Sequence, residues 1–158
     1  MDKRIRKIGF ADTTFSRFNY APVVMEVFTK SGLPISVERY TVPGIKDLPV
    51  ACKKLFRGGC EAVIACGMVG KMPIDKQCSH EASLGMQMVQ TSEGKHIIEV
   101  FVHMDEAKDD RDLASICNDR AHKHAQNVLW LLFDQKKMQS RAGTGRRQGR
   151  KDAGSIKV

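Results

Sequence analysis

Short apolar segments alternate along this chain with segments of helical periodicity. Four segments are short and rich in apolar and β-branched residues, which is typical of strands: residues 5–11, 35–42, 62–66 and 97–102. Each is followed by a segment whose apolar positions recur at helical spacing: residues 19–30, 48–57, 75–92 and 105–133, the last in one or two pieces. This alternation predicts one α/β domain in which a four-stranded parallel sheet is flanked by helices on both faces. The pattern leaves the order of the strands open.

The connection after the second predicted strand is the most informative of the four. Pro43-Gly44 ends that strand and turns the chain. Asp47 is expected to cap the following helix through its carboxylate, and Pro49 fits the first helical turn because an N–H group there would have no helical partner. A strand that leads through such a turn to a helix N-terminus is a common ligand site in α/β proteins.

All four strand-to-helix connections should lie along one edge of a parallel sheet. They are residues 12–16, 43–47, 67–75 and 103–105. Together they contain an aromatic ring, two glycine-containing bends with exposed backbone N–H groups, and several titratable side chains. These groups suit a flat, hydrogen-bonding heterocycle with a polar appendage, so we expect a small-molecule site. Neither GxGxxG nor GxxxxGK[ST] occurs, which argues against dinucleotide and P-loop sites.

Each candidate residue also has a purely structural interpretation. Phe15 could belong to the core, and Asp47 is expected to cap a helix whatever else it does. Lys71 could be a solvated loop charge, and His80 and His103 could be structural. Local patterns alone therefore leave the chemistry of the site open.

The composition and the charge exclude some classes of protein but do not indicate a function. The chain has 158 residues, of which 42% are hydrophobic, and a net charge of +8. No apolar run approaches the ~18 residues of a membrane span, and the charged N-terminus predicts no secretory signal. We therefore expect a cytoplasmic protein with no membrane partner. The cysteines include no Cys-x-x-Cys pair and are interpreted as buried free thiols rather than as disulfides or a zinc site.

The composition changes near the C-terminus. Residues 1–139 are predicted to form the α/β domain, and residues 140–158 a basic, glycine-rich tail that carries +5 of the net charge of +8. Such a tail is expected to be flexible or loosely docked. It could be solvated, pair with acidic groups of a neighbouring subunit, or bind phosphate backbones nonspecifically, and we expect no specific nucleic-acid partner.

Six blocks of sequence resemble the lumazine synthase superfamily, and most closely its archaeal type of riboflavin synthase. They are Thr13-Thr14-Phe15, Val42 to Lys54, Cys78 to Gly85, His96 to His103, Asp105 to Asp109, and Arg141-Ala142-Gly143-x-Gly145. The blocks follow one another in order over essentially the whole chain. Their combination is far more specific than any one of them.

The resemblance implies a fold, an assembly and a reaction. The fold is a flavodoxin-like three-layer sandwich, and the assembly is a homopentamer with active sites between adjacent subunits. In the reaction, one molecule of 6,7-dimethyl-8-ribityllumazine donates a four-carbon unit to a second one. The products are riboflavin and 5-amino-6-(D-ribitylamino)uracil. The resemblance implies no redox cofactor and leaves a role for a divalent cation such as Mg²⁺ open.

The resemblance also assigns candidate residues. Substrate-binding roles fall on Thr14, Phe15, Pro43, Gly44, Ile45, Lys46, Asp47, Leu48, Gly67, Met68, Val69, Gly70 and Val102. The segment from Gly67 to Lys71 would form the floor of the site. Val102 and His103 would form a neighbouring wall.

Two departures from the family pattern distinguish between its members. Lumazine synthases place a catalytic His in the loop that corresponds to residues 70–77, and this loop has none. Residues 45–47 likewise replace a Phe-Glu type of pair. Both changes favour riboflavin synthase over lumazine synthase, and a non-catalytic flavin- or lumazine-binding protein is a further alternative. The catalytic base stays open, with His80, His103 and Lys71 as candidates.

Overall fold

The structure is a computed structural model that describes residues 4–158. The prediction that the chain has no secretory signal rests partly on residues 1–3, which lie outside the described residues. The strands are β1 (Arg6–Thr13), β2 (Ile35–Val42), β3 (Ala62–Val69) and β4 (Ile97–His103). The α-helices are α1 (Ala21–Lys30), α2 (Leu48–Arg57), α3 (Pro73–Glu93), α4 (Asp110–Phe133) and α5 (Gln135–Gln139). Two short 3₁₀-helices are η1 (Ile45–Asp47) and η2 (Met104–Glu106).

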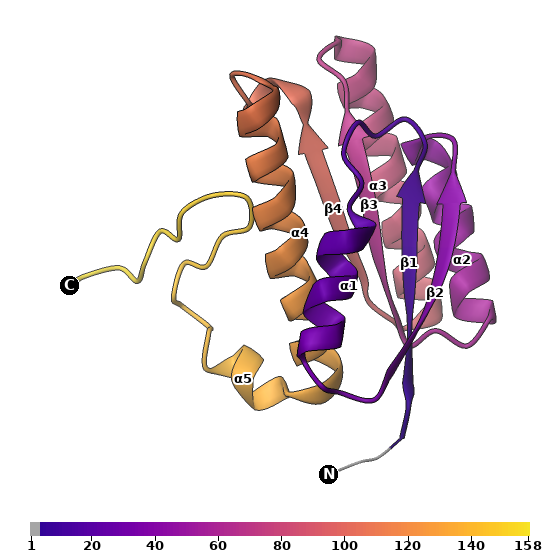
Figure 1. The fold of residues 1–158 in the computed structure, drawn as a ribbon, viewed down its shortest axis with the longest axis vertical. Helices are drawn as coiled ribbons and strands as arrows, with labels where there is room; N and C mark the ends of the chain where they lie inside the picture. The colour runs from indigo at the N-terminus through magenta and orange to yellow at the C-terminus, as the bar shows by residue number, and fades with distance from the viewer. Residues whose placement is uncertain (1–3) are drawn as a thin grey trace.

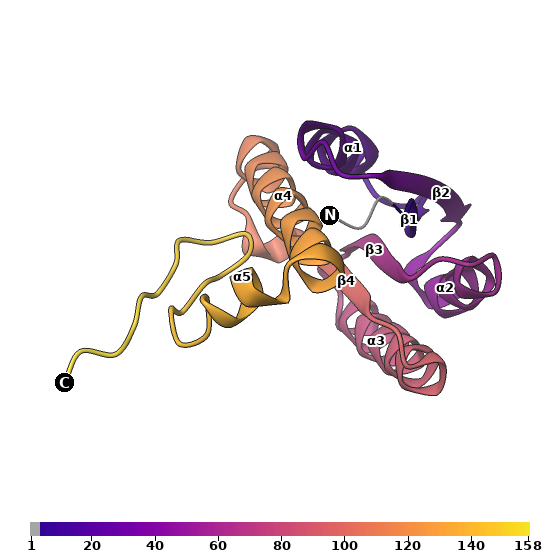
Figure 2. The same cartoon turned by 90° about the horizontal axis from the view of Figure 1, so that it is seen from below.

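The four strands form one sheet in the order β2-β1-β3-β4, and every neighbouring pair is parallel. Helices α1 and α4 cover one face of this sheet, and α2 and α3 cover the other (Figures 1 and 2). The predicted three-layer α/β fold with a four-stranded parallel sheet is therefore confirmed. Among residues 4–158, no helix is long and apolar enough to cross a membrane.

The core consists of two apolar layers, one on each face of the sheet. All eight residues of β3 are buried, as expected for a central strand that helices cover on both sides. Ile64, Cys66 and Met68 pack toward α1 and α4, whereas Val63, Ala65 and Val69 pack toward α2 and α3. The five cysteines are free thiols; four are buried and Cys78 is half-buried.

The central strands extend further than the sequence predicted. Residues 12–13 belong to β1, and residues 67–69, which were expected in a loop, belong to β3. The prediction failed because Gly67 looks like the start of a turn. In the fold its pairing partner on β4 is Phe101, and the ladder continues to Val69 opposite His103.

Two predicted helix starts also differ from the structure. Asp47 stands at the N-terminus of α2, but its side chain accepts no capping hydrogen bond, so that prediction was wrong. The turn η1 precedes the helix, and the backbone N–H of Asp47 donates to the Gly44 carbonyl at 3.1 Å. The last long helix begins at Asp110, after η2, because the carboxylate of Asp109 accepts from the backbone N–H of Asp112 at 2.7 Å.

Candidate functional site

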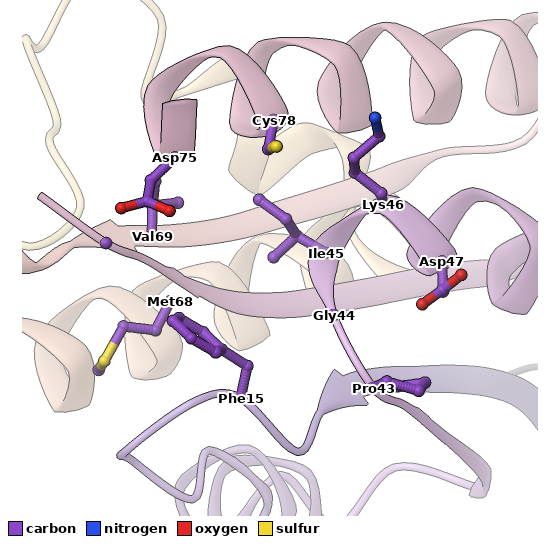
Figure 3. Close-up of a pocket in the computed structure, with 11 residues that line it drawn as sticks. Phe15, Pro43, Gly44, Ile45, Lys46, Asp47, Met68, Val69, Asp75 and Cys78 are labelled. Atoms are coloured by element: carbon purple, nitrogen blue, oxygen red, sulfur yellow. The ribbon is translucent and has the colours of Figure 1, made fainter. Parts of the chain in front are cut away.

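A pocket of about 430 Å³ opens at the carboxyl edge of the sheet. Its size lies in the range of ~300–1,000 Å³ that is typical of small-molecule sites. It is lined by Phe15, Pro43, Gly44, Ile45, Lys46, Asp47, Met68, Val69, Gly70, Asp75 and Cys78 (Figure 3). These residues come from the connections after β1 and β2, from the end of β3, and from Gly70 and the first turns of α3 that follow it. Parallel topology brings these segments to one edge of the sheet.

Phe15 supplies the aromatic surface of the pocket. It is 57% exposed, so the interpretation of Phe15 as a core residue is excluded within this chain. Two backbone hydrogen bonds hold its loop against the turn after β2: Thr14 N–H donates to the Val42 carbonyl at 2.9 Å, and Phe15 N–H donates to the Pro43 carbonyl at 3.2 Å. The ring is thus presented to solvent from a loop that the neighbouring strand fixes.

Ile45 forms part of the pocket because Gly67 beneath it has no side chain. A Cβ atom at Gly67 would lie 2.6 Å from Cγ2 of Ile45 and 3.0 Å from Cε1 of Phe101. Carbon atoms in contact normally stay ~3.5–4.0 Å apart. Gly67 therefore lets the turn after β2 rest directly on β3, which sets the depth of the pocket, although Gly67 itself is not among the lining residues.

The first turn of α3 closes the pocket on the side opposite Phe15, with Ile45 between the two (Figure 3). The Asp75 carboxylate accepts a hydrogen bond from the backbone N–H of Met72 at 2.9 Å, and Cys78 follows one turn later on the same face. The carboxylate also lies against Gly70, where any Cβ atom would collide with it. An acidic side chain at a helix N-terminus is electrostatically favourable.

One charged side chain at the rim is held by an ion pair. The Lys46 ammonium lies 2.7 Å from a carboxylate oxygen of Glu81 on α3. This hydrogen bond raises the pKa of Lys46, and the same bond lowers the pKa of Glu81. Both groups are therefore ionised near neutral pH, and the pair links the turn after β2 to α3.

His103 ends β4 directly opposite Val69, which lines the pocket. Its Nδ1 atom lies 3.3 Å from the ammonium of Lys76, which also pairs with Asp105 at 2.5 Å. Burial, and secondarily the charge of Lys76, lowers the pKa of His103 below its ordinary value of 6.5. The imidazole is therefore mainly neutral at pH 7, and its Nδ1 atom faces the Lys76 ammonium.

The structure leaves several predicted residues outside the pocket of the single chain. His80 is exposed on α3 and Lys71 is exposed in the loop before it. The side chains of Leu48 and Val102 are buried in the two core layers. Thr14 lies beside the pocket, with its hydroxyl 3.3 Å from the Pro43 carbonyl. Their functional roles stay predictions.

Asp75 and Cys78 line the pocket, but the sequence did not mark them as site residues. Asp75 was expected only near the start of a helix. Cys78 was interpreted as a free thiol rather than a zinc ligand, within a block of family resemblance. A signal was present in the sequence, because a spacing of three residues in the first turns of a helix puts both side chains on one face. Among residues 4–158, no group of three or more His, Cys, Asp or Glu side chains is placed to hold a metal ion.

Known proteins with similar sequences support this fold. Residues 7–135 match the family model described as 6,7-dimethyl-8-ribityllumazine synthase. The riboflavin synthases of Methanothermobacter marburgensis and Methanothermobacter thermautotrophicus are each 46% identical over 151 residues, covering 95% of this chain and 99% of the relative. The riboflavin synthase of Archaeoglobus fulgidus is 45% identical over 152 residues, covering 95% of this chain and 98% of the relative. This chain therefore belongs to the 6,7-dimethyl-8-ribityllumazine synthase family.

Proposed function

We propose that the protein is a riboflavin synthase, which converts two molecules of 6,7-dimethyl-8-ribityllumazine into riboflavin and 5-amino-6-(D-ribitylamino)uracil. The observation that carries this proposal is the similarity to archaeal riboflavin synthases over 95% of the chain. The departures at residues 45–47 and 70–77 support it over the lumazine synthase reaction.

The pocket suits one lumazine in both size and chemistry. The flat heterocycle would lie against the ring of Phe15, since stacked aromatic rings gain ~0.5–1.5 kcal/mol beyond the area that they bury. Backbone groups of residues 43–47 would bind the edge of the ring system, and Lys46 and Asp47 at the rim would bind the hydroxyls of the ribityl chain. The protein's main task would be to hold two heterocycles in a reactive orientation.

The reaction needs proton transfers but no external electrons. The C7 methyl group of the lumazine is acidic because the ring delocalises the resulting anion. The two products together contain all the atoms of the two substrates, so the balance requires no redox cofactor. Of the three candidate bases, we favour His103, which is half-buried, neutral at pH 7 and next to the pocket-lining strand β3. Lys71 and His80 are both exposed.

We further propose that the active site is completed by a second subunit of a homopentamer. The pocket of one chain measures about 430 Å³ and presents one aromatic ring, Phe15, whereas the reaction needs two heterocycles. The outer surface of α2 and α3 also carries large apolar side chains, Val50, Leu84 and Met88, each more than half exposed. Large contiguous apolar patches are typical of protein interfaces, and these three exposed side chains support an interface on this face. Sedimentation analysis at several protein concentrations tests the assembly.

The decisive assay supplies 6,7-dimethyl-8-ribityllumazine alone and follows riboflavin by absorbance. Riboflavin should appear together with an equal amount of the uracil product. Parallel reactions with Mg²⁺ and with EDTA test the proposed role of a divalent cation. If no riboflavin forms even with Mg²⁺ present, the proposal is wrong.

The second candidate is lumazine synthase, which the matching family model favours. It would condense 5-amino-6-(D-ribitylamino)uracil with a phosphorylated four-carbon ketone. Lumazine formation from these two substrates, without riboflavin formation from lumazine, would support it. Binding of lumazine with neither reaction would indicate a non-catalytic binding protein.

A further inference from the structure

The segment of residues 146–150, here called the C-terminal strap, docks along α4. After α5 the chain returns beside that helix (Figure 1). The guanidinium of Arg146 lies 4.9 Å from the centre of the Trp130 ring and donates to the Gln126 side-chain oxygen at 2.9 Å. Further along, Gly149 N–H donates to the Asp119 carboxylate at 2.8 Å, and Lys123 donates to the Arg150 carbonyl at 3.1 Å.

These contacts distinguish the strap from a solvated basic tail. Asp119, Lys123, Gln126 and Trp130 recur at intervals of one helical turn, so they form a single row on α4. Two of the hydrogen bonds use backbone groups of the strap, so the strap must adopt a defined conformation for Asp119 and Lys123 to bind them. A tail attracted to the domain only by its net charge would not need to align specific backbone groups with specific residues of α4.

The strap also contacts Arg120, a buried cation on α4 that is only 9% exposed. Its Nε atom donates to the Gln148 carbonyl at 3.3 Å. Its Nη1 and Nη2 atoms bind the two carboxylate oxygens of Glu106 at 2.8 and 3.0 Å, and Nη1 also donates to the Phe101 carbonyl at 2.9 Å. All three guanidinium nitrogens are thus engaged, one of them by the strap.

Glu106 binds both Arg120 and the backbone of His103, and so links the strap to His103. One Glu106 oxygen accepts from the backbone N–H of His103 at 2.9 Å, and Arg150 of the strap lies 3.3 Å from the other. Burial alone would raise the pKa of Glu106, but the hydrogen bonds from Arg120 and from the His103 backbone lower it to about 2. The carboxylate is therefore ionised at any pH at which the enzyme would work.

We propose that the C-terminal strap positions His103 for the reaction, and that Arg120 and Glu106 are the positioning residues that connect the two. The inference rests on the proposed function, in which His103 accepts the proton. The strap fixes Arg120, Arg120 orients Glu106, and Glu106 holds the end of β4 and the turn that carries Asp105. Lys76, which contacts both His103 and Asp105, depends on the same turn.

Gly149 offers a precise perturbation with a matched control in the same tail. A Cβ atom at Gly149 would lie 2.5 Å from Nε and Nη2 of Arg120, and the residue has φ = 77°. Gly143 has nearly the same backbone angle, φ = 76°, but a Cβ atom there would meet nothing within 4 Å. Gly149→Ala should therefore displace the strap, whereas Gly143→Ala adds only the backbone strain that the two variants share.

Three measurements on the full-length variants and on a deletion of residues 146–158 test the proposal. Emission of Trp130, the single tryptophan, reports docking of the strap without any substrate. Steady-state kinetics with lumazine separate kcat from KM. An NMR titration of the His103 imidazole reports its environment in the absence of ligand.

In Gly149→Ala and in the deletion, the Trp130 emission should shift to the red. The value of kcat should fall by about tenfold to a hundredfold with little change in KM, because small displacements of a reacting group have effects of this size. The pKa of His103 should rise toward its ordinary value. Gly143→Ala should match the wild type in all three measurements.

An undocked strap with unchanged kcat and an unchanged His103 titration would overturn the proposal. The deletion keeps the proposal testable, because it removes the strap even if the strap of Gly149→Ala accommodates the added methyl group and stays docked. If the wild-type protein makes no riboflavin, the proposed function fails, and the His103 titration alone still decides whether the strap positions that residue.

Discussion

Replacing Gly67 by alanine tests how the pocket is built. The added Cβ atom would lie 2.6 Å from Cγ2 of Ile45, which is about 1 Å closer than carbon atoms normally approach. Cε1 of Phe101 would lie 3.0 Å from the same Cβ atom, and the ladder with β4 holds the backbone of β3 at Gly67. Ile45 must therefore move outward, into the cavity that it lines.

The expected cost follows from overpacking a tightly filled site. Such substitutions destabilise proteins by about 1–3 kcal/mol. Gly67→Ala should lower the free energy of unfolding by this amount in urea denaturation, and a shift of Ile45 of about 1 Å should also weaken lumazine binding. Gly44→Ala is the control for stability, because Gly44 has extended backbone and a Cβ atom there meets nothing within 4 Å.

A double-mutant cycle identifies the contact that is responsible. Ile45→Ala removes Cγ2, so adding Gly67→Ala to that variant should cost at least 1 kcal/mol less than adding it to the wild type, since neighbouring sites couple by about 0.5–3 kcal/mol. Additive effects of the two substitutions would show that Ile45 does not rest on Gly67. A urea midpoint equal to that of the wild type in Gly67→Ala alone would refute the argument.

Three further predictions concern the site and its supports. Phe15→Ala should weaken lumazine binding about twofold to thirteenfold by fluorescence titration, the equivalent of ~0.5–1.5 kcal/mol of stacking, and leave stability unchanged. An unchanged affinity would remove Phe15 from the site. The pKa of Glu106 is lowered from 4.5 to about 2, so the wild type should lose stability as the pH falls through this window and Glu106→Gln should lose less; parallel urea midpoints for the two proteins would contradict this. Burial lowers the pKa of His124 to about 4, so between pH 6.5 and 4 the imidazole binds a proton in the unfolded chain but not in the folded one. The free energy of unfolding should therefore fall as the pH is lowered through this range in the wild type but not in His124→Gln.

The sequence was sufficient to predict the sheet, because its strand signals are local and strong. β3 is buried along its whole length and reads as a short apolar run, and each strand is followed by a helix of clear periodicity. The order of the strands could not be predicted, since it depends on which of several apolar strands pair across long stretches of chain. The pocket could be located for the same reason as the sheet: parallel topology gathers the connections after the strands at one edge.

What the sequence could not provide was the set of contacts between distant segments. Gly67 was assigned to a loop because glycine usually ends a strand, yet the ladder with β4 continues past it. Asp47 was expected to cap α2, but the single turn η1 places it without a capping hydrogen bond. The basic tail was recognised by its composition alone, and its docking depends on acceptors and an aromatic ring on α4, more than 15 residues earlier in the chain.

Three glycines that look like turn or linker residues share one structural role. Gly67, Gly70 and Gly149 each allow a side chain from another segment to rest where a Cβ atom would be: Ile45, Asp75 and Arg120, respectively. The first two contacts shape the pocket, and the third leads through Glu106 to His103. Glycines with free space around them, such as Gly44 and Gly143, lack this role. Alanine at the first three positions should therefore act on the neighbouring side chain. For Gly67 and Gly149 the controls Gly44→Ala and Gly143→Ala separate this effect from the backbone effect of the substitution.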